Sequence, residues 1–265
     1  MGMRTLFFYL SVVLLCSSSV TSGQSSSEKQ AAGRAWDSLI RTKGGRDKLY
    51  GIKSALLEYH PDRPEEDRFS QLWLFPDYYW ETGYIDLPRK GYAAVNDIAK
   101  HIRKSAGFFS NNIESLDTWA NPDHFERILP FLLETRWFKP EPIRVRRFRK
   151  GKKTLELIET TFRDHRLDFT YEIEDQLVTE VDEYWGDNAP DVLKGRLDQK
   201  WAFDDYVDVD GIKLARRWRM IWFPDLYHAF ADQEFRLSLN VDYDPDLFTR
   251  TLPAIGSNGW RKAVK

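Results

Sequence analysis

Apolar and polar positions alternate along this chain with two different periods, and each period predicts a different kind of element. The first stretch has a helical spacing of apolar residues, made up of Ala31, Ala35, Trp36, Leu39 and Ile40. The spacing stops at Gly44 and Gly45, where a left-handed cap forms easily. The pattern therefore predicts one amphipathic helix that ends at the double glycine.

Three short apolar runs after this helix predict strands at 55–60, 69–75 and 78–85. The first and second runs are separated by 61–67, which combines two prolines with a cluster of charges and breaks regular structure. Around Leu72, Trp73 and Leu74 apolar residues fall on both faces, so the pattern does not say which side is buried.

Between residues 92 and 138 the period changes again and predicts two or three helices inserted between strands. The last of them has the clearest start signal. Asn121 is a good N-cap, Pro122 suits the first helical position, and Asp123 suits the positive end of the helix.

From Ile143 onward apolar and polar residues alternate with period two, which favours half-buried antiparallel strands. Turn residues separate the runs at 150–152, 174–176 and 210–211, and the last of these is the Asp-Gly pair that favours a tight hairpin. No internal repeat and no linker divides the chain, so residues 24–265 are expected to form one domain.

A sheet of this size with one apolar face must curl, meet a second sheet or be covered by helices. The chain supplies helices and no clear second layer of strands. The pattern therefore predicts an α+β fold in which a curled antiparallel sheet forms an unclosed half β-barrel. The N-terminal helix and the inserted helices would cover it, the latter as a lid.

The N-terminus has the order of a secretory signal peptide. Arg4 precedes an apolar run at 6–16, and small polar residues follow at 17–23, so we expect residues 1–23 to be removed by cleavage near 22–23. The run is shorter than the roughly 20 residues that span a bilayer. The alternative, acylation of Cys16 as in a lipoprotein, is disfavoured because Leu14 and Leu15 precede it where a small residue is needed. We expect an exported, periplasmic protein.

Composition limits the chemistry that remains. The chain has 265 residues, with 39 Lys and Arg against 41 Asp and Glu, so its formal net charge is only -2. That balance gives no overall field to attract nucleic acid or an anionic membrane. The one cysteine, Cys16, lies in the predicted signal peptide, so no disulfide, thiol nucleophile or thiolate metal site is expected in the mature chain.

Three stretches together resemble the LolA/LolB-like family of periplasmic lipoprotein carriers. They are the double-glycine helix end at 43–54, the late hairpin at 203–214, and the closing strand with its Asp-Leu-Phe and proline at 239–253. At Ala215 the chain departs from the family, which usually has proline there. The resemblance implies a half-open barrel, lid helices, and an apolar cavity that accepts acyl chains. The fold also serves other roles, so it does not by itself fix the function.

Large apolar side chains of the predicted sheet and lid are the candidates for lining such a cavity. They are Trp73, Phe75, Trp80, Ile128, Leu132, Phe169, Tyr171, Trp218, Met220, Trp222, Leu237 and Leu239. Burying one methylene contributes about 0.8 kcal/mol, so an acyl chain of roughly sixteen carbons can bind without any catalytic group. The alternative is that the same side chains form an ordinary closed core.

The most concentrated charge in the chain is a basic run across one predicted hairpin. It consists of Arg144, Arg146, Arg147, Arg149, Lys150, Lys152 and Lys153. One interpretation is transient contact with anionic lipid headgroups or with a membrane protein. The interpretation we favour is that carboxylates of neighbouring strands pair with these cations, the acidic candidates being Glu172, Glu174, Asp175, Glu180, Asp182 and Glu183.

No sequence motif supports an enzyme. The histidines show no metal-ligand spacing, and there is no nucleophile elbow, phosphate-binding loop or dinucleotide fingerprint, so no cofactor is expected. His60 beside Asp62 and His165 beside Asp164 are the only pairs worth naming, and we expect surface or capping roles for them.

The leading hypothesis is an exported, monomeric, non-enzymatic protein that binds acyl chains of lipids or lipoproteins and carries them between membranes. The alternative is a sensor or interaction module of the envelope that binds a peptide or protein partner in the same groove.

Overall fold

The dominant element is one antiparallel sheet, seen in a computed structural model that describes residues 26–59, 69–75, 78–85, 90–97, 102–106, 112–115, 132–222 and 233–243. Side chains are described at 26–58, 71–75, 132–219 and 236–243. The predicted signal peptide at 1–23 and most of the last predicted helix lie outside these residues.

Two helices open the described chain, α2 (Ser26–Lys43) and α3 (Arg46–Tyr50). The helix predicted before the double glycine is confirmed as α2. Gly44 and Gly45 both have positive φ, and the Gly45 amide closes the helix by donating to the Ile40 carbonyl at 2.8 Å. A side chain at Gly44 would place its Cβ 2.6 Å from the Gly211 carbonyl oxygen, so this close approach to the hairpin at 210–211 requires glycine.

The strands are arranged as two meanders joined in one sheet. They are β1 (Ser54–Tyr59), β2 (Phe69–Leu74), β3 (Tyr78–Ile85), β4 (Lys90–Asp97), β5 (Ile102–Ala106), β6 (Asn112–Ser115), β7 (Glu141–Lys150), β8 (Lys153–Phe162), β9 (His165–Glu172), β10 (Val178–Tyr184), β11 (Leu197–Val209), β12 (Ile212–Trp222) and β13 (Gln233–Leu239). Their order in the sheet is β6-β5-β4-β3-β2-β1-β13-β12-β11-β10-β9-β8-β7. The two meanders are β1–β6 and β7–β13, and the pairing of β1 with β13 joins them.

The three strands predicted before residue 86 and the three predicted hairpin turns are confirmed. At the tightest turn Asp210 and Gly211 both have positive φ, and the Gly211 amide donates to the Asp208 carboxylate at 2.6 Å. Asp and Gly tolerate the left-handed backbone that such a two-residue turn demands, which is why the sequence identifies it.

The predicted helices between 92 and 115 are wrong, because this stretch forms β4, β5 and β6. This stretch has few apolar residues, and short apolar runs fit both the helical and the strand period. Their spacing therefore cannot distinguish a helix from a strand. The deciding factor is tertiary: β3 offers β4 an eight-residue partner in antiparallel register, from Tyr78 opposite Asp97 to Ile85 opposite Lys90. The last predicted helix begins at Asn121, and its residues up to 131 lie outside the described part of the chain.

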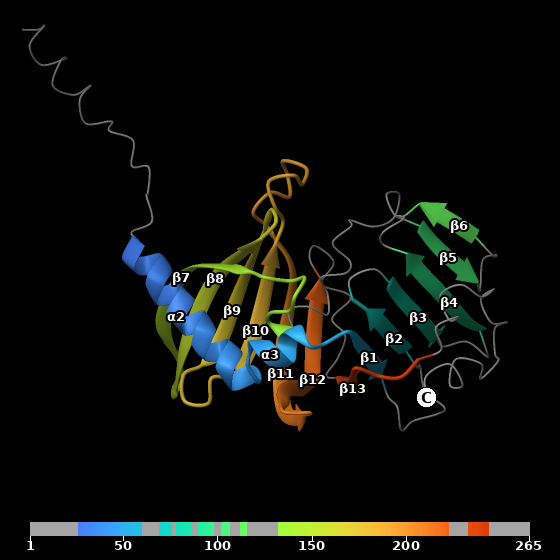
Figure 1. Cartoon of the computed structure of the whole chain (residues 1–265). Helices are drawn as coiled ribbons and strands as arrows, with labels where there is room; N and C mark the ends of the chain where they lie inside the picture. The colour runs from blue at the N-terminus through green and yellow to red at the C-terminus, as the bar shows by residue number, and fades with distance from the viewer. Residues whose placement is uncertain are drawn as a thin grey trace, which may run out of the picture.

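The predicted fold class is confirmed as α+β with an unclosed antiparallel sheet. The two outermost strands in the sheet order, β6 and β7, have no partner strand on their outer sides among the described residues. Figure 1 shows α2 lying across the strands from β7 toward β10. Trp36 of α2 packs edge-on against Phe169 of β9 with ring centroids 4.9 Å apart, so the helix covers the concave face.

Among the described residues two pairs join β12 and β13, Arg217 with Glu234 and Trp218 with Gln233, and the next pair in this register would involve residue 232, which lies outside them. We call this place the β12–β13 joint.

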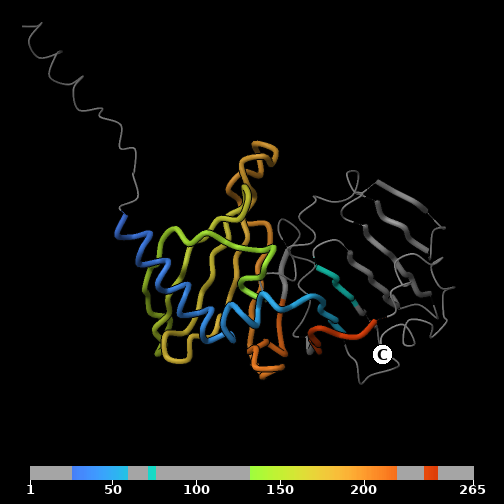
Figure 2. The backbone as a smooth tube through the Cα atoms, in the orientation of Figure 1, coloured from blue at the N-terminus to red at the C-terminus, as the bar shows by residue number. Residues whose placement is uncertain are grey.

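Residues 44–54 cross at the joint on their way from α2 to β1, as the path of the tube in Figure 2 shows. Lys48 donates to the Gly211 carbonyl at 3.3 Å, and the Lys53 amide donates to the Asn240 side chain at 2.7 Å. The crossing chain therefore bonds to the end of β12 on one side and to the end of β13 on the other.

Candidate functional site

The part of the concave face beneath α2 is a closed core. Phe169 is 0% exposed, and Tyr171 and Ile158 beside it are also buried. The Tyr171 hydroxyl donates to Glu156, and burial together with that carboxylate raises the pKa of the phenol. Since Trp36 and its neighbours on α2 occupy the space above these residues, this area is filled by the protein's own side chains.

The apolar surface changes character at the β12–β13 joint. Here apolar side chains pack against the core but keep part of their surface exposed, namely Tyr206, Val209, Ala215, Trp218 and Leu237. Phe75, just past the end of β2, is partly buried in the same way. We call these six residues the joint strip. It offers partly exposed apolar area beside the core.

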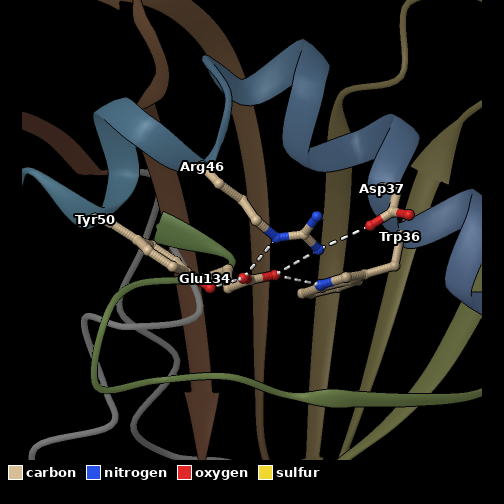
Figure 3. Close-up of polar contacts among 5 residues, drawn as sticks. All are labelled: Trp36, Asp37, Arg46, Tyr50 and Glu134. Carbon is tan, nitrogen blue, oxygen red and sulfur yellow. Dashed lines mark hydrogen bonds and ion pairs between the residues drawn. The ribbon is translucent and has the colours of Figure 1, made fainter.

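A buried carboxylate anchors the chain that leads into β7. Glu134 is 4% exposed, and it accepts hydrogen bonds from the Trp36 indole at 2.9 Å, from the Arg46 Nε at 2.9 Å and from the Tyr50 hydroxyl (Figure 3). Arg46 also donates to Asp37 at 2.8 Å. Burial alone opposes ionisation, but the hydrogen bonds from Arg46, Tyr50 and Trp36 outweigh it and lower the pKa of Glu134.

The anchored residues 132–138, which we call the crossing segment, lie against the core on both sides of Glu134. Leu132 and Phe138 are fully buried, and Phe138 packs edge-on against Phe162 with ring centroids 4.7 Å apart. Trp137 stacks on Phe75 of the joint strip at 5.8 Å. The segment therefore connects the closed core under α2 with the partly exposed joint.

Lys43, the last residue of α2, is buried near the joint. It is 6% exposed, and its Nζ lies 5.5 Å from the ring centroid of Tyr206 in β11. Within the described residues no carboxylate forms an ion pair with it. Burial lowers the pKa of its amine to about 7.

His165, Glu183 and Gln199 form a buried polar group on the concave face. The sequence predicts a surface or capping role for His165, but the side chain is buried, with Nδ1 3.2 Å from the carboxylate of Glu183. Gln199 donates to the same carboxylate, and all three side chains are less than a tenth exposed. Position 165 continues the inward series of Leu167 and Phe169, which explains its burial. His60 and Asp62 lie outside the described residues.

The basic hairpin behaves largely as the favoured interpretation predicts. Arg144 and Arg146 pair with Glu159, Arg147 pairs with Glu156, Lys150 with Glu180, and Lys153 with Glu172. Glu172 and Glu180 are among the expected partners, while Glu156 and Glu159 are not. Within the described part of the chain, Arg149 and Lys152 form no ion pair, so these two cations face solvent.

Carboxylates also line up across the convex face. Register places Glu159 opposite Asp168, Asp168 opposite Asp182, and Asp182 opposite Lys200. Burial raises the pKa of Asp168 to about 6. The flanking cations balance this row, and no group of three or more potential ligands in the described residues is arranged to hold a metal ion.

Of the predicted lining residues, the structure places five in the closed core or at its margin: Trp73, Leu132, Phe169, Tyr171 and Leu239. Three lie in the joint strip: Phe75, Trp218 and Leu237. Trp80, Met220 and Trp222 occupy positions in β3 and β12 where only the backbone is described, and Ile128 lies outside the described residues.

Sequence reasoning missed Lys43 and Glu134. A lysine in the last turn of a helix ordinarily faces solvent and favours the helix dipole, so its type and position give no sign of burial. Glu134 lies in a stretch with no regular pattern, and its partners are 84 to 98 residues away in the sequence. Among the described helices none has the length and apolarity needed to cross a membrane.

Comparison with known proteins gives structural matches only. No family model and no curated protein matches the chain. A DUF1329 family protein from Desulfovibrio piger ATCC 29098 is 13% identical, with 82% of this chain and 96% of that chain covered and a TM-score of 0.48. A LolA superfamily protein from Nitrosomonas europaea is 11% identical, with 80% of this chain and 96% of that chain covered and the same TM-score of 0.48. The structure neighbours of this chain therefore include a LolA superfamily protein and a DUF1329 family protein.

Proposed function

We propose that the protein binds the acyl chain of a lipid or lipoprotein along the joint strip, without enzymatic chemistry, and carries it between membranes of the cell envelope. The observation that supports this most is the contrast in burial on one concave face. Under α2 the central residues Phe169, Tyr171 and Ile158 are buried, whereas at the joint Trp218, Leu237 and Phe75 keep exposed surface beside the core.

The energetics of binding favour the joint over the core. Each methylene buried contributes about 0.8 kcal/mol, so a guest needs only a strip of apolar surface several methylenes long to bind. Reaching Phe169 or Tyr171 would instead require displacing α2 from its own packing, at a cost of several kcal/mol for each large side chain uncovered. In this proposal the acyl chain therefore contacts fewer of the twelve predicted lining residues than the sequence suggests.

The crossing segment is the covering element in this proposal. Trp137 lies on Phe75, so movement of residues 132–138 would change how much of the joint strip is open. Glu134 holds that segment to α2 and α3 through three side chains. An envelope location follows from the predicted signal peptide at 1–23 and belongs to the same proposal.

Contact with a membrane surface is the remaining part of the proposal. The carboxylates that pair with the basic hairpin leave Arg149 and Lys152 at its end available to approach anionic headgroups, at a gain of about 1 kcal/mol for each cation near the surface. This is enough for transient contact and too little for stable anchoring.

Native mass spectrometry of the protein purified from its own periplasm tests the function. We expect bound lipid that organic solvent removes. Trp218→Glu and Leu237→Glu should abolish the occupancy, whereas Phe148→Glu, a matched change at a side chain 39% exposed in the basic edge strand β7, should leave it intact. A folded Trp218→Glu variant with unchanged lipid, or a stable protein complex with no lipid, would contradict the proposal and favour a peptide or protein partner.

A further inference from the structure

Lys43 is a buried cation without a compensating charge among the described residues. Burying an ammonium group without a partner is expensive, and folded proteins normally pair or expose it. Yet the side chain is 6% exposed, and its Nζ lies over the ring of Tyr206, 5.5 Å from the ring centroid. Methionine would fill the same volume at no electrostatic cost.

The described groups around Lys43 are mostly neutral, and the charged one is Asp175, whose carboxylate acts on Tyr206. The Tyr206 hydroxyl donates to the Val178 carbonyl at 2.6 Å, and burial raises the pKa of that phenol, so it stays uncharged. Above Lys43 on α2, Thr42 and Ser38 donate to the Gln176 side chain at 2.9 and 2.7 Å. Among the described residues no carboxylate forms an ion pair with the Lys43 amine, so the amine is available to an incoming anion, although the charge of Asp175 near Tyr206 would repel that anion.

Position links Lys43 to the joint strip. Its contact residue Tyr206 belongs to the strip and is paired with Ala215 on β12. Tyr206 on β11 and Trp218 on β12 both pack against the same hydrophobic core. A headgroup at Lys43 and a chain along β12 and β13 are thus compatible.

We propose that the Lys43 ammonium binds the acidic headgroup, a carboxylate or a phosphate, of a single-chain amphiphile whose alkyl part lies along the joint strip. This inference rests on the proposed function and deepens it by assigning the headgroup chemistry. An anion beside Lys43 would compensate the buried charge, and low surrounding polarity would strengthen the pair. A neutral amphiphile would gain only the apolar contacts.

Three probes of equal chain length test the inference by titration of intrinsic tryptophan fluorescence: palmitate, hexadecyl phosphate and hexadecanol. We expect the two anions to bind at least about tenfold more tightly than the alcohol, since a buried charged pair contributes more than one decade of affinity. In the Lys43→Met variant that preference should disappear while hexadecanol binding stays within about twofold. Preference for one anion over the other identifies the headgroup.

The matched control is Lys48→Met, a lysine five positions along whose exposed side chain donates to the Gly211 carbonyl. It should keep the anion preference. An NMR titration of the Lys43 side chain adds a readout that a structural role would not move: palmitate should raise its pKa and hexadecanol should not.

The outcomes separate the two proposals. If all three probes bind and Lys43→Met leaves the anion preference unchanged, the headgroup site is wrong and the acyl-binding function stands. If no probe binds the wild-type protein, the proposed function fails as well. A thermal melt of Lys43→Met shows that it folds, which we expect because the variant removes a buried charge.

Discussion

The concave face carries aromatic and aliphatic side chains both under α2 and at the β12–β13 joint, but their burial differs between the two areas. Under α2 the central side chains are buried, with Trp36 packed against Phe169, while Ala35 and Val145 are partly exposed. At the joint Trp218 and Leu237 stay partly exposed. Stability resides in the first area and, in our account, binding resides in the second.

The sharpest way to break this comparison is to truncate the closed core. Phe169→Ala should lower the free energy of unfolding by about 3 to 5 kcal/mol, because it leaves a cavity beneath α2. Urea denaturation measures the loss. Palmitate affinity of the folded variant should change little, and a large drop in affinity at preserved fold would place the guest under the helix instead.

Lys43→Met should have the next largest effect, in the opposite direction. Burial lowers the pKa of Lys43 from its ordinary 10.5 to about 7, so below pH 7 the buried charge destabilises the fold, and between pH 7 and 10.5 the penalty is relieved as pH rises. The variant should be about 2 to 4 kcal/mol more stable at pH 6. Unfolding measured from pH 6 to 10 should show a rise in wild-type stability that the variant lacks.

Glu134→Gln probes the anchor of the crossing segment. It replaces a carboxylate that accepts from Trp36, Arg46 and Tyr50, and we expect a loss of about 2 kcal/mol. Because the pKa in the folded protein is lowered, the carboxylate contributes its full stability above the ordinary glutamate pKa of 4.5 and loses it as pH falls through the lower folded value. A variant with the wild-type acid dependence between pH 5 and 2 would contradict this role.

At the joint itself the effect on stability should be small. Leu237→Ala removes a partly exposed side chain, and we expect about 1 kcal/mol of destabilisation together with a clear loss of palmitate affinity. The ratio of the two effects is the informative quantity, measured by urea denaturation and fluorescence titration on the same sample. Equal affinity in Leu237→Ala and wild type would remove this residue from the lining.

The smallest effect is expected at the hairpin end. Arg149→Gln with Lys152→Gln should change stability by less than about 0.5 kcal/mol, since neither side chain forms an ion pair within the described residues. Sedimentation with vesicles containing anionic lipid should nevertheless fall relative to the wild type. Equal sedimentation of the two proteins would argue against membrane contact by this hairpin.

The sequence predicts those elements whose signals are local. The helix that ends at Gly44 and Gly45 and the turn at Asp210 and Gly211 depend on neighbouring residues, and both are present. The strands β4 to β6 are mistaken for helices because their few apolar residues fit both periods, and only pairing with β3 decides between them.

The sequence predicts which apolar residues face inward, but it does not predict which of them stay partly exposed. Alternation identifies the inward residues of β9 and β12 together, yet it cannot tell that α2 seals Phe169 and leaves Trp218 partly exposed. Lys43 and Glu134 give no signal, because burial of a charged residue depends on which distant segment packs over it. Such information is absent from any window of neighbouring residues.

Photolabelling with a palmitate that carries a diazirine in its alkyl chain tests the central claim most directly. The probe is irradiated in the folded protein, and the labelled peptides are mapped by mass spectrometry. We predict labels on β12 and β13 around Trp218 and Leu237, with competition by unlabelled palmitate. Competed labels confined to α2 and β9, around Trp36 and Phe169, would contradict the account.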